Sequence, residues 1–204
     1  METKPDYYFK NISQSPFKEI FNVNFIWEVL KRKDDFLEEV SGGNAVVDPT
    51  VEIKEGCVIE KPCWIGENCV IGPSAYIRKN TVIGKNCKIR GEVKNSVICD
   101  NTNIPHHSYV GDSVFGSNVN FAAGAITTNF KFDGSNIEVK GKNLGRKFGA
   151  VIGDNVKVGS NVVTAPGTFI GPDTWIYPLS FVRGFVPENS IIKNKPNLEI
   201  VKKN

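Results

Sequence analysis

The sequence of 204 residues has only two histidines, His106 and His107, and they are adjacent. A zinc site built from histidines needs three of them, and the five cysteines show neither a CxxC pair nor a Cys/His ligand spacing. The chain also lacks any stretch of about 18 apolar residues, the length that a membrane-spanning helix needs. We therefore expect no metal ion in the site and no membrane segment.

Charge of one sign is not in excess either. The chain carries 25 basic and 22 acidic residues, a formal net charge of +3, which is too small to argue for a nucleic-acid partner. The first residues, METKPDYYFK, contain no apolar core of a signal peptide. These features predict a cytoplasmic protein.

What the sequence does have is a strict period of six. Isoleucine recurs at positions 53, 59, 65, 71, 77, 83 and 89. A column of smaller side chains keeps the same period, at Val51, Cys57, Cys63, Cys69, Ala75, Thr81, Cys87 and Val93. Six fits neither the 3.6-residue period of an α-helix nor the alternation of a long strand. It is the signature of a parallel β-helix, an all-β solenoid of short strands and corners, so most cysteines should be buried and reduced.

The repeat also sets the predicted domain limits. The period resumes at Ile98 after a short excursion, and it runs again from Ile152 to Val182. We therefore predict the β-helix over residues 45–186, followed by a tail at 187–204. The segment at about 127–150 is rich in Lys, Asn and Gly and lacks the column residues, which predicts a long side loop. Long loops on rigid scaffolds often carry function.

Residues 1–44 follow a different pattern. Apolar residues from Asn24 to Val40 recur at spacings of three and four, which predicts an amphipathic helix. Asn24 is placed to cap this helix, and Ser41-Gly42 to end it. Because the first coil of a solenoid exposes its hydrophobic end, we expect the helix to cover that end.

One segment is more specific than the repeat. It reads H-x-x-Y-x-G-D-S over residues 106–113 and N-x-x-A-G-x-x-T-x-N over residues 120–129. This string resembles the acetyltransferase domain of bifunctional UDP-N-acetylglucosamine pyrophosphorylase/glucosamine-1-phosphate N-acetyltransferase. The long side loop ending at Lys147 is most similar to the archaeal-type sugar-1-phosphate nucleotidylyltransferase/acetyltransferase form. The resemblance covers about Ile65 to Pro187, and no Gly-rich nucleotidyltransferase domain accompanies it.

The resemblance implies an architecture. The family fold is a left-handed β-helix in which three hexapeptides make one triangular coil, so about six coils are expected. It also implies a homotrimer whose sites lie between neighbouring subunits, with the side loop reaching across. The implied reaction uses acetyl-CoA as co-substrate to N-acetylate an amino-sugar 1-phosphate, either glucosamine-1-phosphate or galactosamine-1-phosphate.

The resemblance also assigns residue roles. Catalytic positions fall on His106 as the base, on Glu92 near it, and on Asn129 near the acetyl thioester. Positions that bind the sugar and its phosphate fall on Arg78, Lys94, Tyr109, Asn120 and Lys147. Positions that bind acetyl-CoA fall on Ala123, Ser160 and Lys195. Two residues depart from the family pattern: Pro178 replaces a small residue of the pantetheine groove, and Lys195 replaces an arginine.

Chemistry supports these residue types. An amine is mostly protonated at neutral pH, and an imidazole, with an ordinary pKa of about 6.5, accepts its proton during attack on a thioester. Three cations suit a doubly charged phosphate. Taken alone, Asp112 and Asp154 follow glycine and are read as corner residues.

Two other classes of protein stay open. A γ-class carbonic anhydrase shares the fold but needs three zinc-binding histidines, which this chain does not have. A noncatalytic scaffold or sugar-phosphate-binding subunit of a nucleotide-sugar pathway would keep the solenoid without turnover. His106, Glu92, Tyr109 and Asn120 together argue against that second class.

Overall fold

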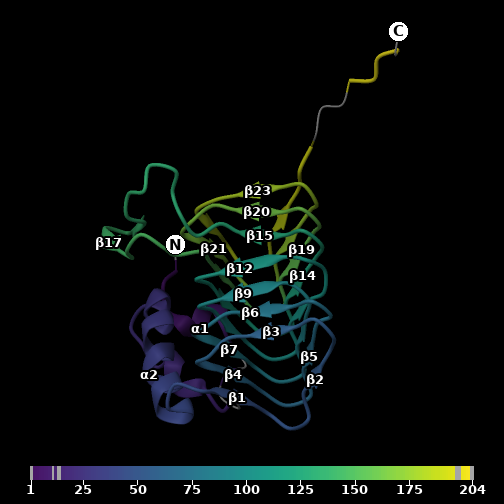
Figure 1. The fold of residues 1–204 in the computed structure, drawn as a ribbon. Coiled ribbons are helices and arrows are strands. Elements are labelled where there is room, and N and C mark those ends of the chain that lie inside the picture. Colours follow the sequence, from purple (N-terminus) through teal and green to yellow (C-terminus); the bar gives the residue numbers. More distant parts are fainter. Residues whose placement is uncertain (1, 11, 13–14, 196–198, 203–204) are drawn as a thin grey trace.

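The structure is a computed structural model that describes residues 2–10, 12, 15–195 and 199–202. Its main body is a left-handed parallel β-helix whose short strands stack into three sheets (Figure 1). We call these sheets A, B and C. In the described residues, sheets A and B have eight strands each and sheet C has seven. The predicted solenoid is therefore confirmed.

Each sheet takes every third strand of the solenoid. Sheet A contains β1 Ala45–Val47, β4 Cys63–Ile65, β7 Thr81–Ile83, β10 Val97–Ile98, β13 Val114–Phe115, β18 Ala150–Ile152, β21 Thr168–Ile170 and β24 Phe185–Val186. Sheet B contains β2 Glu52–Ile53, β5 Val70–Ile71, β8 Lys88–Ile89, β11 Asn103–Ile104, β14 Asn120–Phe121, β19 Lys157–Val158, β22 Trp175–Ile176 and β25 Ile191–Ile192. Sheet C contains β3 Val58–Ile59, β6 Tyr76–Ile77, β9 Glu92–Lys94, β12 Tyr109–Gly111, β15 Ile126–Thr127, β20 Val163–Thr164 and β23 Phe181–Val182.

The described stack has about eight turns, so the expected count of six was wrong. One reason is that β24 and β25 continue sheets A and B as far as Ile192. The other is that some coils are short: Ile98 pairs with both Ile83 and Phe115, which are 15 and 17 residues away rather than 18. The excursion in the sequence period before Ile98 is thus a shortened coil.

The two columns of the sequence repeat form the core. Their isoleucines and cysteines are buried from Cys63 onwards, in one continuous apolar cluster that runs the length of the solenoid. Phe115 and Phe121 meet inside it with ring centroids 5.1 Å apart. Left-handed backbone recurs at the corners, where asparagine is the commonest residue. Burial of these columns is what stabilises the stack.

A second apolar cluster lies outside the solenoid. The outward side chains of sheet A are apolar along the whole stack: Val46, Trp64, Val82, Val97, Val114, Val151, Phe169 and Phe185. The N-terminal segment packs on this face through Tyr8, Phe17, Ile26 and Leu37, among others. The hydrophobic outer face of sheet A therefore determines where the N-terminal residues lie.

The N-terminal helices are short. They are α1 Pro5–Tyr8, the 3-10 helices η2 Lys18–Phe21 and η3 Ile26–Glu28, and α2 Val29–Ser41. They lie along the flank of the solenoid beside sheet A (Figure 1), so the expectation that α2 covers the end of the first coil was wrong. Asn24 does not cap α2, whose N-cap position is Glu28, but Gly42 ends the helix in left-handed backbone as predicted. No helix in the described ranges is long and apolar enough to span a membrane.

The side loop joins β15 to β18 and is partly ordered by its own hairpin, β16 Glu138–Val139 with β17 Lys142–Asn143. Its buried residues Ile137, Val139 and Phe148 join the outer cluster, where Phe148 stacks on Phe169 at 5.8 Å. Phe132, in contrast, is fully exposed. The loop is therefore anchored on sheet A at its base and exposed at its tip.

Candidate functional site

One corner of the prism, between sheets B and C, collects several of the predicted residues. We call it the B–C edge, and it comprises residues 90–91, 105–108, 122–125, 159–162 and 177–180. Backbone hydrogen bonds join successive corners, from His107 N–H to Arg90 O, Gly124 N–H to His106 O, Asn161 N–H to Ala123 O and Leu179 N–H to Ser160 O. His106, Ala123 and Ser160 thus lie on three consecutive coils of one edge.

The two histidines differ in backbone conformation. Both side chains are exposed, and among the described residues neither imidazole has a hydrogen-bond partner. His106 is held through its carbonyl oxygen, which accepts from Ser108 Oγ at 3.2 Å and from Gly124 N–H at 3.1 Å. His107 has a φ of 40°, the left-handed conformation of a tight corner. His107 therefore makes the turn that presents His106.

An open groove of about 340 Å³ lies on sheet C beside this edge. Its lining is Ser74, Tyr76, Gly91, Glu92, His107, Ser108, Tyr109 and Ile126. Burial raises the pKa of Tyr109, so its hydroxyl stays protonated at neutral pH. This hydroxyl accepts a hydrogen bond from Asn129 Nδ2 at 3.2 Å. Gly111 makes the contact feasible, because a Cβ there would lie 2.4 Å from the Tyr109 oxygen.

Arg78 and Glu92 form an ion pair on the outer face of sheet C. The Arg78 guanidinium donates to Glu92 Oε1 at 2.9 Å and lies over the Tyr76 ring, 5.5 Å from its centroid. Hydrogen bonding to Glu92 raises the pKa of Arg78. The carboxylate predicted to assist the base is therefore paired with a cation predicted to bind phosphate.

A polar cluster occupies the corner between sheets C and A. Its hub is Asp112, whose carboxylate accepts from Asn95 Nδ2 at 2.6 Å and also from Asn129 Nδ2. Lys94 Nζ lies 3.3 Å from Asp112 Oδ2. We call Asp112, Lys94, Asn95 and Asn129, together with Lys33 of α2, the Asp112 cluster. Asp112 is a corner residue, as expected, with a φ of 50°, but its carboxylate also links two predicted site residues.

Asn129 has a defined orientation in this cluster. Its Nδ2 group donates both to Asp112 and to Tyr109. To donate to an oxyanion from the side chain, Asn129 must open one of these bonds when substrate binds. The backbone carbonyl oxygen of Asn129 accepts from Phe148 N–H at 3.1 Å, which places the exposed Lys147 at the base of the side loop, next in sequence to that contact.

The remaining predicted residues lie on sheet B or beyond it. Asn120 and Ser160 line a groove of about 430 Å³ that also contains Lys157 and Pro178. Lys195 is exposed and follows Asn194, whose side chain donates to Leu179 O at 2.7 Å. Because Leu179 N–H in turn bonds to Ser160 O, Lys195 continues the B–C edge past Ser160.

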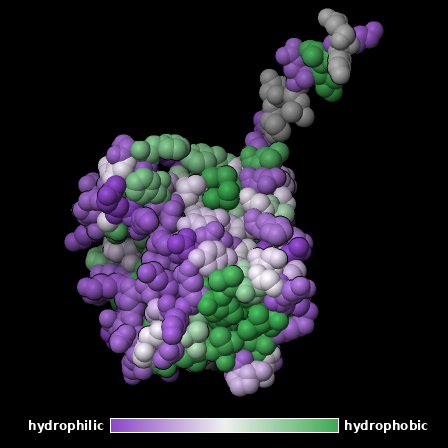
Figure 2. All heavy atoms as spheres, in the orientation of Figure 1, coloured by the Kyte–Doolittle hydropathy of each residue, from purple (hydrophilic) through white to green (hydrophobic). Residues whose placement is uncertain are grey.

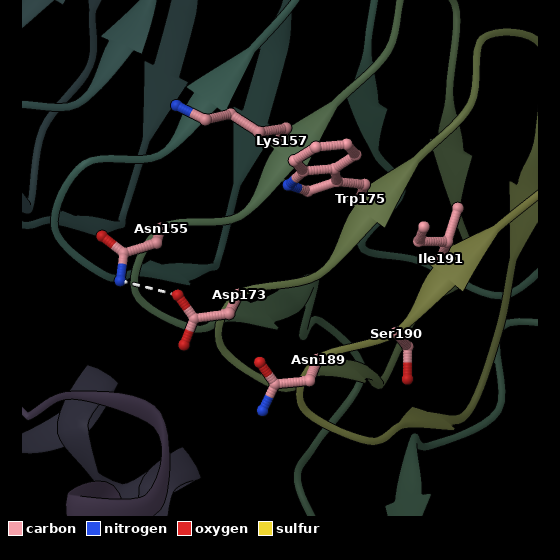
Figure 3. Close-up of a pocket in the computed structure, with 7 residues that line it drawn as sticks. All are labelled: Asn155, Lys157, Asp173, Trp175, Asn189, Ser190 and Ile191. Carbon is pink, nitrogen blue, oxygen red and sulfur yellow. Dashed lines mark hydrogen bonds between the residues drawn. The ribbon is translucent and has the colours of Figure 1, made fainter.

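The structure therefore gathers the predicted residues in two groups. His106, Ala123 and Ser160 follow the B–C edge, with Asn120 beside it on sheet B. Glu92, Tyr109, Arg78, Lys94 and Asn129 cover sheet C and its far corner. A neighbouring groove, lined by Asn155, Lys157, Asp173, Trp175, Asn189, Ser190 and Ile191, contains none of the predicted residues (Figure 3). The described residues contain no group of three His, Cys, Asp or Glu arranged to hold a metal.

Sequence reasoning missed some residues of the site. Tyr76 and Ser74 sit one coil before Glu92, and only the pairing of β6 with β9 shows that they share its groove. The sequence does carry a signal for Lys33. This lysine falls four residues after Val29 and four before Leu37, on the apolar face of the predicted helix, and it is fully buried.

The period of six and the three-sheet stack define a hexapeptide-repeat protein with a left-handed β-helix. Comparison with known proteins gives the same class of fold. The family model described as the GMPPB C-terminal domain matches residues 62–148, and the hexapeptide repeat of succinyl-transferase matches residues 141–173. A solved structure of LpxA from Acinetobacter baumannii shares the fold, with a TM-score of 0.51 and 17% identity over 73% of this chain and 67% of that one.

Proteins of similar sequence show to which hexapeptide-repeat proteins this β-helix is related. "Bifunctional protein GlmU" of Methanococcus maripaludis is 44% identical over 116 residues, 55% of this chain and 28% of that protein. The "bifunctional sugar-1-phosphate nucleotidylyltransferase/acetyltransferase" of Sulfurisphaera tokodaii is 49% identical over 92 residues, 43% of this chain and 23% of that protein. The chain thus spans about a quarter of the relatives it matches. Its β-helix is related to that of the GlmU-type sugar-phosphate acetyltransferases, which confirms the resemblance predicted from the motif.

Proposed function

We propose that this chain is an acyltransferase that moves the acetyl group of acetyl-CoA to the amine of an amino-sugar 1-phosphate. The observation that carries the proposal is the B–C edge, where His106 and Ser160 are two coils apart. On one side of this edge lies the sheet C groove that contains Glu92 and Tyr109, and on the other lies the sheet B groove that contains Asn120 and Ser160. A base, a polar acceptor groove and phosphate-binding cations are the parts that such a transfer requires.

His106 is the proposed general base. The amine attacks in its neutral form, after the ammonium has lost one proton to solvent, and the exposed imidazole takes a second proton from the nitrogen as it bonds to the thioester carbonyl carbon. The carbonyl oxygen then carries the negative charge. Collapse of this intermediate breaks the carbon–sulfur bond, and the departing thiolate takes up the proton held by His106. The products are the acetamido sugar phosphate and CoA.

The acceptor is proposed to be held by sheet C and its far corner, together with Asn120 from sheet B. Arg78, Lys94 and Lys147 are proposed to bind the phosphate, and Tyr109 and Asn120 to bind the sugar hydroxyls. Lys94 is partly buried beside Asp112, which limits its freedom before substrate binds. Glu92 is proposed to assist His106, although in the free chain it is paired with Arg78.

The acetyl-CoA contacts are proposed to follow the B–C edge through Ala123 and Ser160 to Lys195. The groove beside Ser160 takes its lining from three consecutive coils and mixes apolar side chains, such as Trp175 and Pro178, with the cation Lys157. That lining suits a chain of amides and methylenes that ends in phosphates. The proline that departs from the family pattern lies in the wall of this groove and leaves it open.

A homotrimer with sites between subunits is part of the proposal. The faces on either side of the B–C edge expose large apolar side chains, among them Val58 and Phe181 on sheet C and Trp175 and Ile191 on sheet B. The view of sheet C shows a hydrophobic area over its first coils (Figure 2). Exposed apolar surface of this kind suits contact with another subunit. Light scattering at several concentrations tests the stoichiometry.

The decisive experiment is release of CoA thiol from acetyl-CoA, with glucosamine-1-phosphate, galactosamine-1-phosphate and a buffer blank as the three arms. Release that depends on acceptor, together with a mass increase of one acetyl group on the sugar phosphate, supports the proposal and selects the sugar. No release above the blank from a folded protein contradicts it. A noncatalytic sugar-phosphate-binding subunit would bind the sugar phosphate in calorimetry without releasing thiol.

A further inference from the structure

Lys33 is a buried cation that no step of the proposed reaction uses. It is the one lysine among the described residues whose side chain is fully buried, and it lies on α2 between Val29 and Leu37. Desolvation lowers its pKa, while a hydrogen bond to Asp34 opposes the shift. A methionine would fill the same space without the cost of burying a charge. The lysine is therefore poorly explained by packing alone.

The Lys33 ammonium reaches from the N-terminal helix to the solenoid. It lies 2.5 Å from Asp34 Oδ1 on its own helix and 2.9 Å from Asn95 Oδ1, a residue 62 positions away in the chain. Asp34 is half exposed, so this ion pair alone would not require Lys33 to be buried. The contact with Asn95 is what the burial achieves.

The hydrogen bond from Lys33 fixes the orientation of the Asn95 amide, and this amide in turn binds Asp112. The Oδ1 of Asn95 is occupied by Lys33, so its Nδ2 must face the opposite way, where it donates to Asp112 Oδ1 at 2.6 Å. An amide with both ends bonded has one orientation. Asp112 itself is almost fully buried, and it lies next to Lys94 and Asn129. Lys33 is thus one side chain removed from the carboxylate that holds two predicted site residues.

We propose that Lys33 is a positioning residue for the acceptor end of the site, through Asn95 and Asp112. The inference rests on the proposed function, because Lys94, Asn129 and Tyr109 are the residues it positions. With Asn95 fixed, Asp112 Oδ1 is occupied and Oδ2 stays available to Asn129, which in turn holds Tyr109. Without Lys33, the Asn95 amide is free to rotate and Asp112 loses its fixed donor. The N-terminal segment is therefore a functional part of the site as well as a cover for sheet A.

The test compares Lys33→Met with Lys33→Gln and with a matched control, Lys31→Met, which removes an exposed lysine from the same helix. For Lys33→Met we expect an acceptor KM about 10-fold higher, an unchanged KM for acetyl-CoA and a melting temperature equal to or above that of the parent. Lys33→Gln keeps a donor for Asn95 and should recover most of the acceptor affinity. Lys31→Met should match the parent in all three.

The outcomes separate this inference from the proposed function. If the parent turns over and Lys33→Met has the parent's acceptor KM, Lys33 has no positioning role. If both KM values rise together, or Lys33→Gln fails to recover, the role is general stability and the inference is overturned. If the parent shows no turnover, calorimetry with glucosamine-1-phosphate decides: weaker binding by Lys33→Met than by Lys31→Met supports the inference although the reaction is wrong. If Lys33→Met does not fold, Lys33→Gln against Lys31→Met gives the same comparison.

Discussion

Arg78 donates a hydrogen bond to Glu92 Oε1 at 2.9 Å, and both side chains are about one-third exposed at 35% and 36%. This pair joins two roles that the sequence assigned separately, phosphate binding and assistance to the base. In the proposed role of Arg78, an incoming phosphate competes with Glu92 for the guanidinium. Binding of that phosphate would then free the Glu92 carboxylate in the groove that Tyr109 lines.

Glu92→Gln should change KM and kcat in opposite directions. Removing the negative charge frees Arg78, so the acceptor KM should fall about 2–5-fold, the value of a partly exposed ion pair. Loss of the carboxylate near the base should lower kcat roughly 10-fold. Steady-state kinetics with varied sugar phosphate measures both. Glu60→Gln is the control, because Glu60 bonds to the Tyr76 hydroxyl at the next coil and not to Arg78. A higher KM in Glu92→Gln would contradict this account of the pair.

His106→Ala should abolish turnover and leave the fold intact. General-base catalysis contributes about 100-fold or more, so kcat should fall at least that far. The side chain is exposed and makes no hydrogen bond among the described residues, so the melting temperature should not change. His107→Asn is the comparison, since asparagine tolerates the φ of 40° found there. It should alter acceptor KM more than kcat. Turnover that survives His106→Ala would remove His106 from its role.

Phe169→Ala should destabilise the chain by about 3–5 kcal/mol. Phe169 is fully buried under the N-terminal segment, where its ring meets those of Tyr8, Trp27 and Phe148. Phe181 has the same outward position on sheet C but is 65% exposed, so Phe181→Ala should cost far less in the isolated chain. Urea unfolding measures both. Equal costs would mean that the N-terminal segment does not pack on sheet A.

The five free cysteines should differ in reactivity. Cys63, Cys69, Cys87 and Cys99 are buried, and burial raises the pKa of Cys63 to about 11. A pH of 8 is well below that pKa, so the Cys63 thiol stays protonated and unreactive. Cys57 is half-buried, so a thiol reagent should titrate about one group in the native protein and five after denaturation. Cys57→Ser should remove the native signal. Rapid reaction of several thiols would contradict the burial of these cysteines. The number of reactive protein thiols also gives the background signal to subtract in the CoA assay.

The solenoid could be predicted because its cause is local. Each coil repeats the same inward pair, as in Cys63 and Ile65, and burial of that pair needs no distant partner. The number of coils could not, because the shortened coil before Ile98 keeps its strand pairing while losing the sequence period. The position of the N-terminal segment was also missed. Its determinant is a column of outward residues such as Val82 and Val114, which recur only once per coil.

The candidate site divides in the same way. His106, Tyr109 and Asn129 come from one contiguous motif, so the sequence brings them forward together. The bonds that fix them do not follow from the motif, since Asp112 looked like a corner and Lys33 like a helix residue. Their contacts depend on how a helix from residues 29–41 packs against coils formed 60 or more residues later in the chain. Such packing has no local period.

The coils are evenly spaced along the B–C edge, so the number of coils between two residues of this edge sets the distance between them. His106, Ala123, Ser160, Leu179 and Asn194 follow one another coil by coil, and neighbouring parallel strands are about 4.8 Å apart. The four steps from His106 to Asn194 thus measure about 19 Å. Inserting one whole coil between Ala123 and Ser160 would lengthen the distance from the proposed base to the proposed distal cofactor contacts by about 4.8 Å without disturbing either. The length over which the proposed acetyl-CoA contacts extend is therefore a whole number of coil spacings.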